Sequence, residues 1–154
     1  MGSTASAHLA YGFDLGNIDN FRAAERDEYG GPAPTWYSDD EGRPEFAVQL
    51  CDALYAATGL AAEGDADRRQ SAAEQRYGVE VAFCGTDEYQ GWVLIVTGSE
   101  RDACNADVLT LDPFVLERTP VDEGWDGKLE TALKALGITP TQDGPAWLVF
   151  PSYG

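Results

Sequence analysis

The apolar residues of this chain occur in short runs, and the longest strongly apolar run covers only residues 92–96. A membrane-spanning helix needs roughly 20 such residues, so the sequence predicts none. Residues 79–83 and 92–97 are rich in β-branched and aromatic side chains, which favours two strands joined by a long turn. Alternating small and aromatic residues predict another strand over 4–13, and residues 146–150 predict a closing strand. Shorter strands are expected at 35–37 and 108–111.

Three longer segments have the composition and spacing of helices, and each is followed by a glycine that can end a helix. The predicted helices cover 44–58, a segment from 65 or 67 to 77, and about 121–136, and they are followed by Gly59, Gly78 and Gly137. Pro44 suits the first turn of the first helix because its backbone angle is fixed. Asp112 followed by a proline predicts one further helical turn.

The expected order of elements is strand, two helices, two strands, helix and strand. This order predicts a single α+β domain over residues 1–154, with a mainly antiparallel sheet and about three helices packed on one face, as in a split βαβ arrangement. Residues 14–43 show little periodicity and contain several glycines and prolines, so we expect a long irregular loop there. Its aromatic side chains are expected to fasten it to the surface, since unsupported loops of this length are uncommon.

The formal net charge of −17 on 154 residues, from 27 acidic and 10 basic residues, limits what this chain binds. Residues 86–130 alone hold eleven acidic and three basic residues. Such a charge repels nucleic acid, anionic membranes and acidic ligands, and it attracts basic partners from a distance. The 44% hydrophobic content indicates a packed protein rather than a disordered acidic chain. We therefore expect no direct binding to nucleic acid or membrane.

The sequence contains no strong motif for catalysis or for cofactor binding. His8 is the only histidine, so any site that needs an imidazole has to use it, and its place in a predicted strand is typical of a half-buried sheet residue. A phosphate-binding loop with its spacing and lysine is absent, and the acidic groups do not match an EF-hand calcium loop. We therefore name no catalytic residue and expect no cofactor and no metal ion.

The three cysteines, Cys51, Cys84 and Cys104, are widely spaced and form no CxxC pair. Neither a zinc ribbon nor a thioredoxin-type redox pair is expected, and the thiols are predicted to lie in or near the core. Three free thiols, and an N-terminus without the basic start and apolar run of a secretory signal, favour a cytoplasmic location.

The most interface-like segment is Trp36-Tyr37, which is followed by the acidic residues 39–41. Aromatic side chains are common anchors in protein interfaces, and neighbouring acidic residues steer a basic partner. A second acidic group lies at the beginning of the predicted last helix. The candidate partner-binding residues are therefore Trp36, Tyr37, Asp39, Asp40, Glu41, Asp122, Glu123 and Asp126. The alternatives are that the aromatic residues fasten the loop to the core and that the acidic residues cap or solvate helix ends.

Several short motifs lie at both ends and in the middle of the chain: AYGFDLG at 10–16, YGVE at 77–80, ALKALGITPT at 132–141, WL at 147–148 and SYG at 152–154. With these motifs the chain resembles small acidic proteins found across actinobacterial phage genomes, whereas residues 17–43 depart from them. The motifs concern composition and packing, so the resemblance implies no catalytic residue. It implies a phage-encoded protein that works in the cytoplasm of a bacterial host.

The phage context and the net charge together predict a protein that binds and inhibits a nucleic-acid-acting protein of the host, of the anti-restriction or anti-CRISPR type. Proteins of that class neutralise phosphates with Lys and Arg, and an acidic protein can occupy such a surface by partial mimicry of nucleic-acid charge. Two alternatives stay open at this point: a small enzyme that depends on carboxylates or on Cys84, and a phage structural or assembly protein.

Overall fold

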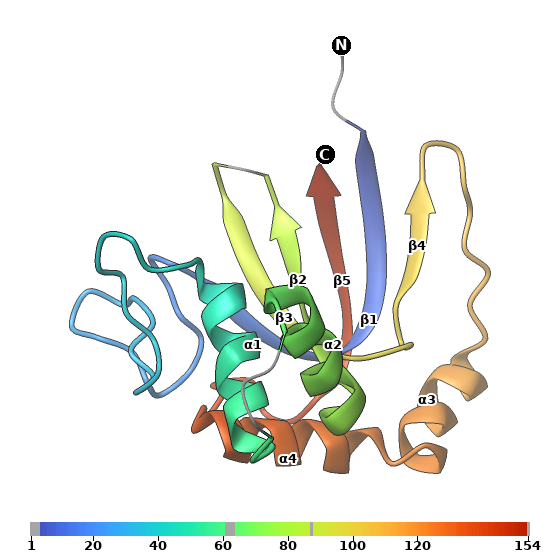
Figure 1. Ribbon diagram of the computed structural model, residues 1–154. Coiled ribbons are helices and arrows are strands. Elements are labelled where there is room, and N and C mark those ends of the chain that lie inside the picture. The colour runs from blue at the N-terminus through green and yellow to red at the C-terminus, as the bar shows by residue number, and fades with distance from the viewer. Residues whose placement is uncertain (1–3, 61–63, 87, 154) are drawn as a thin grey trace.

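The computed structural model describes residues 4–60, 64–86 and 88–153, and these contain five strands and four helices. In chain order they are β1 (Ala5–Asn17), α1 (Phe46–Ala57), α2 (Ala66–Tyr77), β2 (Val79–Gly85), β3 (Gln90–Val96), β4 (Arg101–Cys104), α3 (Pro113–Asp122), α4 (Trp125–Leu136) and β5 (Ala146–Tyr153). The strands form one mainly antiparallel sheet, and α1, α2 and α4 pack together on one side of it (Figure 1). The predicted α+β class is therefore confirmed. Within the described residues, no helix is long and apolar enough to cross a membrane.

The sheet depends on β1, because this strand pairs with three others. Its first half pairs with β5 on one edge and with β4 on the other, and its second half, from Gly12 onwards, pairs with β3. The hairpin of β2 and β3 meets β5 at a single parallel bridge between Gly85 and Ser152. The sheet, in the order β3-β2-β5-β1-β4, therefore curls until β3 returns to β1.

The predicted split βαβ arrangement is present where β1 and β3 pair. β1 and β2 are connected through α1 and α2, and both run antiparallel to β3, which lies between them. The second half of β1 is thus parallel to β2 and separated from it by a third strand, as the motif requires.

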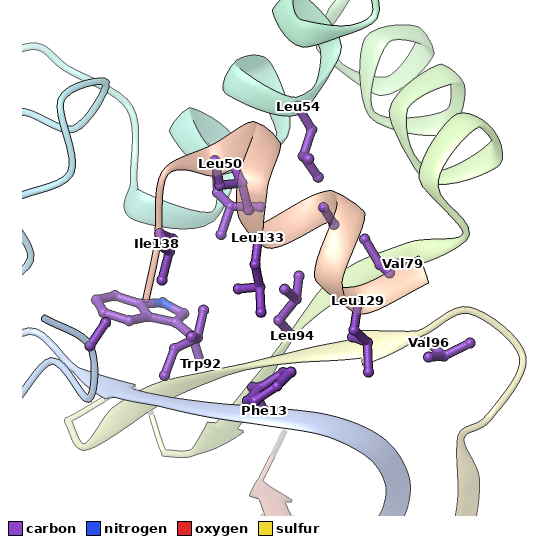
Figure 2. Close-up of a cluster of buried hydrophobic side chains, with 14 of the residues drawn as sticks. Phe13, Leu50, Leu54, Val79, Trp92, Leu94, Val96, Leu129, Leu133 and Ile138 are labelled. Atoms are coloured by element: carbon purple, nitrogen blue, oxygen red, sulfur yellow. The ribbon is translucent and has the colours of Figure 1, made fainter. Parts of the chain in front are cut away.

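From Gly91 to Val96, β3 is buried on both of its faces, which accounts for the uninterrupted apolar run over residues 92–96. Trp92, Leu94 and Val96 belong to the large core cluster, which Figure 2 shows between the sheet and the helices. Val93 and Ile95 alternate with them and belong to a second, smaller cluster inside the curl of the sheet. The other buried members of this smaller cluster are Ala10 and Phe150.

Gly12 lies where β1 passes from β5 to β3, and it pairs with a residue of each strand. A β-carbon at this position would lie 1.9 Å from the backbone carbonyl oxygen of Leu94. Glycine is therefore required for the close approach of β1 to β3 that lets the sheet curl.

The longer predicted helices are confirmed, with small changes at their ends. α1 begins at Phe46, two residues after Pro44. α2 begins after Asp65, whose side chain accepts a hydrogen bond from the backbone N–H of Arg68, and it ends at Gly78 in a left-handed conformation. The strands predicted over 4–13, 79–83, 92–97 and 146–150 are also confirmed as β1, β2, β3 and β5.

Two predicted short strands are wrong. Residues 35–37 lie in a turn, which a backbone hydrogen bond from Tyr37 to Pro34 closes. Residues 108–111 are irregular and exposed, and the short strand of this region is β4 instead. The sequence does not predict β4, because its residues, RDAC, include two charged side chains and no run of apolar ones.

The boundary of the last helix is also corrected. α4 begins at Trp125 rather than Val121, because Gly124 adopts a left-handed conformation with φ 65° and separates α4 from α3. Val121 belongs to α3, which has ten residues where the sequence predicts a single turn.

The loop predicted over 14–43 is irregular only from residue 18 onwards, because β1 extends through Asn17. Phe21 is fully buried, and Trp36 and Tyr37 pack against the core, so these aromatic residues fasten the loop as expected. Tyr29 differs from them because it is exposed. Isolated bridges add further support, and they join Gly16 to Phe21, Ala23 to Pro140 and Arg26 to Pro32.

We expect Gly12→Ala to destabilise the fold by about 3 kcal/mol, because the added methyl group forces β1 away from β3. Gly127→Ala is the matched control: Gly127 lies in α4 with open space around its Cα, so alanine should stabilise the helix by about 0.5–1 kcal/mol. Urea unfolding of the two variants measures both effects. Equal stability of the Gly12→Ala variant and the unmodified chain would contradict the role given to this glycine.

Candidate functional site

Trp36 and Tyr37, the predicted aromatic anchors, are partly buried against the core. Both rings pack on Phe46 of α1, with centroids 5.5 Å apart in each case. The Nε1 of Trp36 also donates a 2.8 Å hydrogen bond to the carbonyl of Leu136 at the end of α4. The two side chains therefore fasten the loop to the core, which is one of the two interpretations that the sequence leaves open.

The two predicted acidic groups are exposed but lie apart. Residues 39–41 lie in the loop before α1, close in sequence to Trp36, which is bound to the C-terminal end of α4. The other group, residues 122–126, surrounds the N-terminal end of α4, and at 1.5 Å per residue this helix separates its two ends by about 17 Å. Figure 1 shows the loop before α1 and the α3–α4 junction at opposite sides of the molecule. The exposed acidic residues are Asp39, Asp40, Glu41, Asp122, Glu123 and Asp126.

Asp126 also has a structural role. Its carboxylate accepts a 2.6 Å hydrogen bond from the hydroxyl of Tyr11 on β1. Burial raises the pKa of Tyr11, and the hydrogen bond and the charge of Asp126 raise it further. The Tyr11 ring lies against Trp125 and Trp147, so this contact helps hold α4 against the sheet.

An exposed apolar surface covers α3 and the segment before it. Its apolar members are Val108, Leu109, Leu111, Phe114, Val115 and Val121, among which Phe114 is 76% and Val121 is 78% exposed. Five exposed acidic residues lie among them in the sequence: Asp107, Asp112, Glu117, Asp122 and Glu123. We call these eleven residues the α3 surface. Because Pro120 is the buried residue of α3, the helix presents most of its circumference to solvent.

Two contacts position α3 although little of it is buried. The side chain of Asp112 accepts a 3.0 Å hydrogen bond from the backbone N–H of Phe114 at the start of the helix. The Nε1 of Trp147 on β5 donates a 2.7 Å hydrogen bond to the carbonyl of Leu116. Residues 108–116, VLTLDPFVL, are mostly apolar and indicate this surface in the sequence. The sequence alone does not show that these residues stay outside the core.

A second candidate site lies on the first half of β1, where His8 contacts residues of both neighbouring strands. The Nδ1 of His8 lies 2.5 Å from Oδ1 of Asp102 and 3.2 Å from Oε1 of Glu100. Its Nε2 lies 2.6 Å from the Oγ of Ser152 on β5. The imidazole ring also stacks on Phe150 with centroids 5.2 Å apart. We call His8, Glu100, Asp102 and Ser152 the His8 cluster.

The strand register brings these side chains together. Asp102 and Phe150 are the residues directly opposite His8 on β4 and β5, so the three side chains share one face of the sheet. The sequence singles out His8 but not its partners. β4, which follows Glu100 and contains Asp102, is not predicted, and Ser152 lies two residues beyond the predicted end of the last strand.

The two carboxylates of the His8 cluster influence each other's protonation. Burial raises the pKa of Glu100, and a hydrogen bond to Asp102 raises it further. Burial also acts to raise the pKa of Asp102, but the hydrogen bonds to His8 and Glu100 outweigh this effect and lower the pKa below its usual value. Glu100 is therefore the carboxyl group that retains a proton more readily.

The geometry of the His8 cluster permits two kinds of chemistry, which require opposite tautomers of the imidazole. With the proton on Nδ1, His8 donates to Asp102 and Nε2 accepts the hydroxyl proton of Ser152, as in a serine nucleophile site. With the proton on Nε2, His8 donates to Ser152 and the lone pair of Nδ1 points towards the two carboxylates, as in a metal site.

Two of the three cysteines have environments that disfavour reactivity. Cys51 is buried in α1, and burial raises the pKa of its thiol to about 11. Burial and the charge of Asp14 raise the pKa of Cys84. Since the thiolate is the nucleophilic form, these environments do not activate either thiol.

We expect Cys51 in the native protein at pH 8 to react with a disulfide reagent such as DTNB at least ~100-fold more slowly than free cysteine, because very little thiolate forms at a pKa of about 11. Raising the pH towards 11 should accelerate the reaction. In guanidinium chloride all three thiols should react at similar rates. In the native protein, Cys51→Ala should remove the slow phase of the reaction with the reagent. A native Cys51 that reacts as quickly as free cysteine would contradict the expected burial.

Comparison with protein-family models, with curated proteins and with solved structures found no match to this chain.

Proposed function

We propose that this chain is a binding protein that inhibits a nucleic-acid-acting protein of a bacterial host, of the anti-restriction or anti-CRISPR type, by covering its basic surface. In this proposal it acts in the host cytoplasm. The observation that carries the proposal is the α3 surface, which combines exposed apolar side chains with acidic ones on α3 and the segments that flank it.

The apolar residues of the α3 surface supply the affinity in this proposal. Exposed apolar groups that are rimmed by polar residues are typical of protein interaction sites. Phe114 and Val121 are seven residues apart, so they lie on the same side of α3 and can enter one groove of a partner. Full burial of a phenylalanine side chain contributes about 1.5–3 kcal/mol, which makes Phe114 the expected anchor.

The acidic residues select the partner. Five acidic residues belong to the α3 surface, whereas its helix carries the single basic residue Arg118, which is paired with Asp122 at 3.5 Å. A surface with this charge favours a groove lined with Lys and Arg, and proteins that bind nucleic acid provide such grooves. Residues 39–41 are too far from α3 to share one small contact, and we assign them the long-range attraction of a basic partner.

The alternative of a phage assembly protein makes a different use of the same surface. Exposed apolar residues can also join two copies of the chain, but each copy carries a charge of −17, which opposes their association. The alternative of an enzyme rests on the His8 cluster rather than on Cys84, because the environment of Cys84 raises its pKa.

The test compares two variants that change the net charge equally. One carries Glu117→Lys, Asp122→Lys and Glu123→Lys on the α3 surface, and the other carries Asp39→Lys, Asp40→Lys and Glu41→Lys in the loop. Asp126 is left unchanged because it binds Tyr11. All six positions are exposed, so both variants should fold, which circular dichroism checks.

We expect the tagged chain to capture a nucleic-acid-acting protein from the lysate of an actinobacterium, with weaker capture at high salt and displacement by duplex DNA. The α3 variant should lose this capture, and the loop variant should retain it with a slower association rate. Phe114→Ala should weaken binding to the captured protein about 30-fold or more in Kd, measured by calorimetry. Capture that is unchanged in the α3 variant, or salt-insensitive self-association as the sole result, would refute the proposal.

A further inference from the structure

We infer that the His8 cluster binds a divalent transition-metal ion, with Nδ1 of His8 and one carboxylate oxygen each of Glu100 and Asp102 as ligands. These three atoms all lie within 4.8 Å of one another. The site lies on the β1–β4 side of the sheet and shares no residue with the α3 surface, so it does not depend on the function proposed above.

The distances between the three ligand atoms suit an ion in their midst. Zn²⁺ and similar ions lie about 2.1 Å from nitrogen and oxygen ligands, so two ligands of one ion are about 3.0–3.4 Å apart. The 3.2 Å between Nδ1 of His8 and Oε1 of Glu100 falls in this range. The 2.5 Å between Nδ1 and Asp102 requires this carboxylate to move by less than about 1 Å, and its side chain is 49% exposed, so solvent leaves room for this movement.

The remaining atoms of His8 are held as in known metal sites. A histidine ligand commonly donates its second ring N–H to an oxygen, which fixes the tautomer and the orientation of the ring. The Oγ of Ser152, at 2.6 Å from Nε2, is placed to accept this hydrogen bond. Phe150 stacks on the ring, and the side chain of His8 is 15% exposed, so the imidazole has little freedom to turn.

The presence of two carboxylates favours the metal ion over a serine nucleophile. A catalytic serine site uses one carboxylate to orient its histidine, whereas here Glu100 adds a second negative group beside the same nitrogen. Two carboxylates in contact repel each other unless they share a proton or a cation. Ser152 also lies within a regular strand after Pro151, not on the sharp turn that exposes the nucleophile of an α/β-hydrolase.

The ligand types limit which ion can bind. One imidazole and two carboxylates suit Zn²⁺, Mn²⁺, Fe²⁺ or Co²⁺, whereas Ca²⁺ and Mg²⁺ prefer oxygen ligands alone. Cys104 lies on the same face of β4 as Asp102, but two residues along a strand are about 7 Å apart, and its thiol pairs with Ser6 at 3.2 Å. Three protein ligands leave at least one position on the ion for water or for a ligand from solution.

The test is titration of the chelator-treated full chain with Zn²⁺ by calorimetry and with Co²⁺ by visible absorption. We expect one site with a Kd in the micromolar range or below, and His8→Gln and Asp102→Asn should each weaken it at least 100-fold. Ser152→Ala should weaken it about 10-fold, as is typical for the loss of a group that orients a ligand. The control variant Asp39→Asn with Asp40→Asn removes two exposed carboxylates elsewhere and should bind like the unmodified chain.

The single histidine allows a second readout by ¹⁵N NMR, because the two ring nitrogens give the only imidazole signals of the chain. We expect the proton on Nε2 and a shift of the Nδ1 signal when Zn²⁺ is added. Asp102→Asn keeps the test decisive if the His8 variant fails to fold, since Asp102 lies exposed on the edge strand β4. Zn²⁺ binding by the His8→Gln and Asp102→Asn variants that is as tight as binding by the unmodified chain would overturn the inference. The inference would also be overturned if the proton stayed on Nδ1 with Zn²⁺ present and the chain hydrolysed p-nitrophenyl acetate in a reaction that Ser152→Ala abolishes.

Discussion

The pairing of β1 with β3 at one end and with β4 and β5 at the other is the interaction on which the rest of the structure depends. One strand can make these pairs only where its backbone approaches a neighbour very closely. β1 does so at Gly12, which lies opposite Ile95 and against the backbone carbonyl of Leu94. The resulting curl gives the sheet two different faces. One face carries the large core under α1, α2 and α4, and the other closes around the small cluster that contains Phe150.

The same pairing creates the His8 cluster. Because the first half of β1 lies between β4 and β5, His8 meets side chains that are 94 and 144 residues away in the sequence, Asp102 and Ser152. Strand register sets the spacing of these residues, since His8 and Asp102 are direct partners across a ladder and Ser152 lies on the adjoining strand. Sites held by strands are better defined than sites held by loops, which suits a group of ligands that has to surround an ion.

The sequence predicts the elements whose periodicity is strong and misses those that depend on tertiary pairing. The apolar stripe of α4 and the alternation of β1 are visible in the sequence, and so is the α+β class. β4 is not, because a short edge strand with the sequence RDAC is stabilised by pairing with β1 rather than by an apolar pattern. Residues 108–111 show the opposite case, in which apolar residues that suggest a buried strand remain exposed. Both candidate sites involve this poorly predicted region between β3 and α4.

α3 is exposed because the other helices leave it no place on the sheet, and its apolar side chains therefore stay in solvent. The helix-facing side of the sheet is already covered by α1, α2 and α4, so α3 lies beside α4, and Pro120 is its buried residue. Apolar side chains that stay outside the core would join copies of the same chain if the surface were neutral. The acidic residues among them oppose that association, because two such surfaces repel each other. In the proposed function, a basic partner would remove the repulsion and bury the same apolar groups, so the charge would select the partner and the apolar residues would supply the affinity.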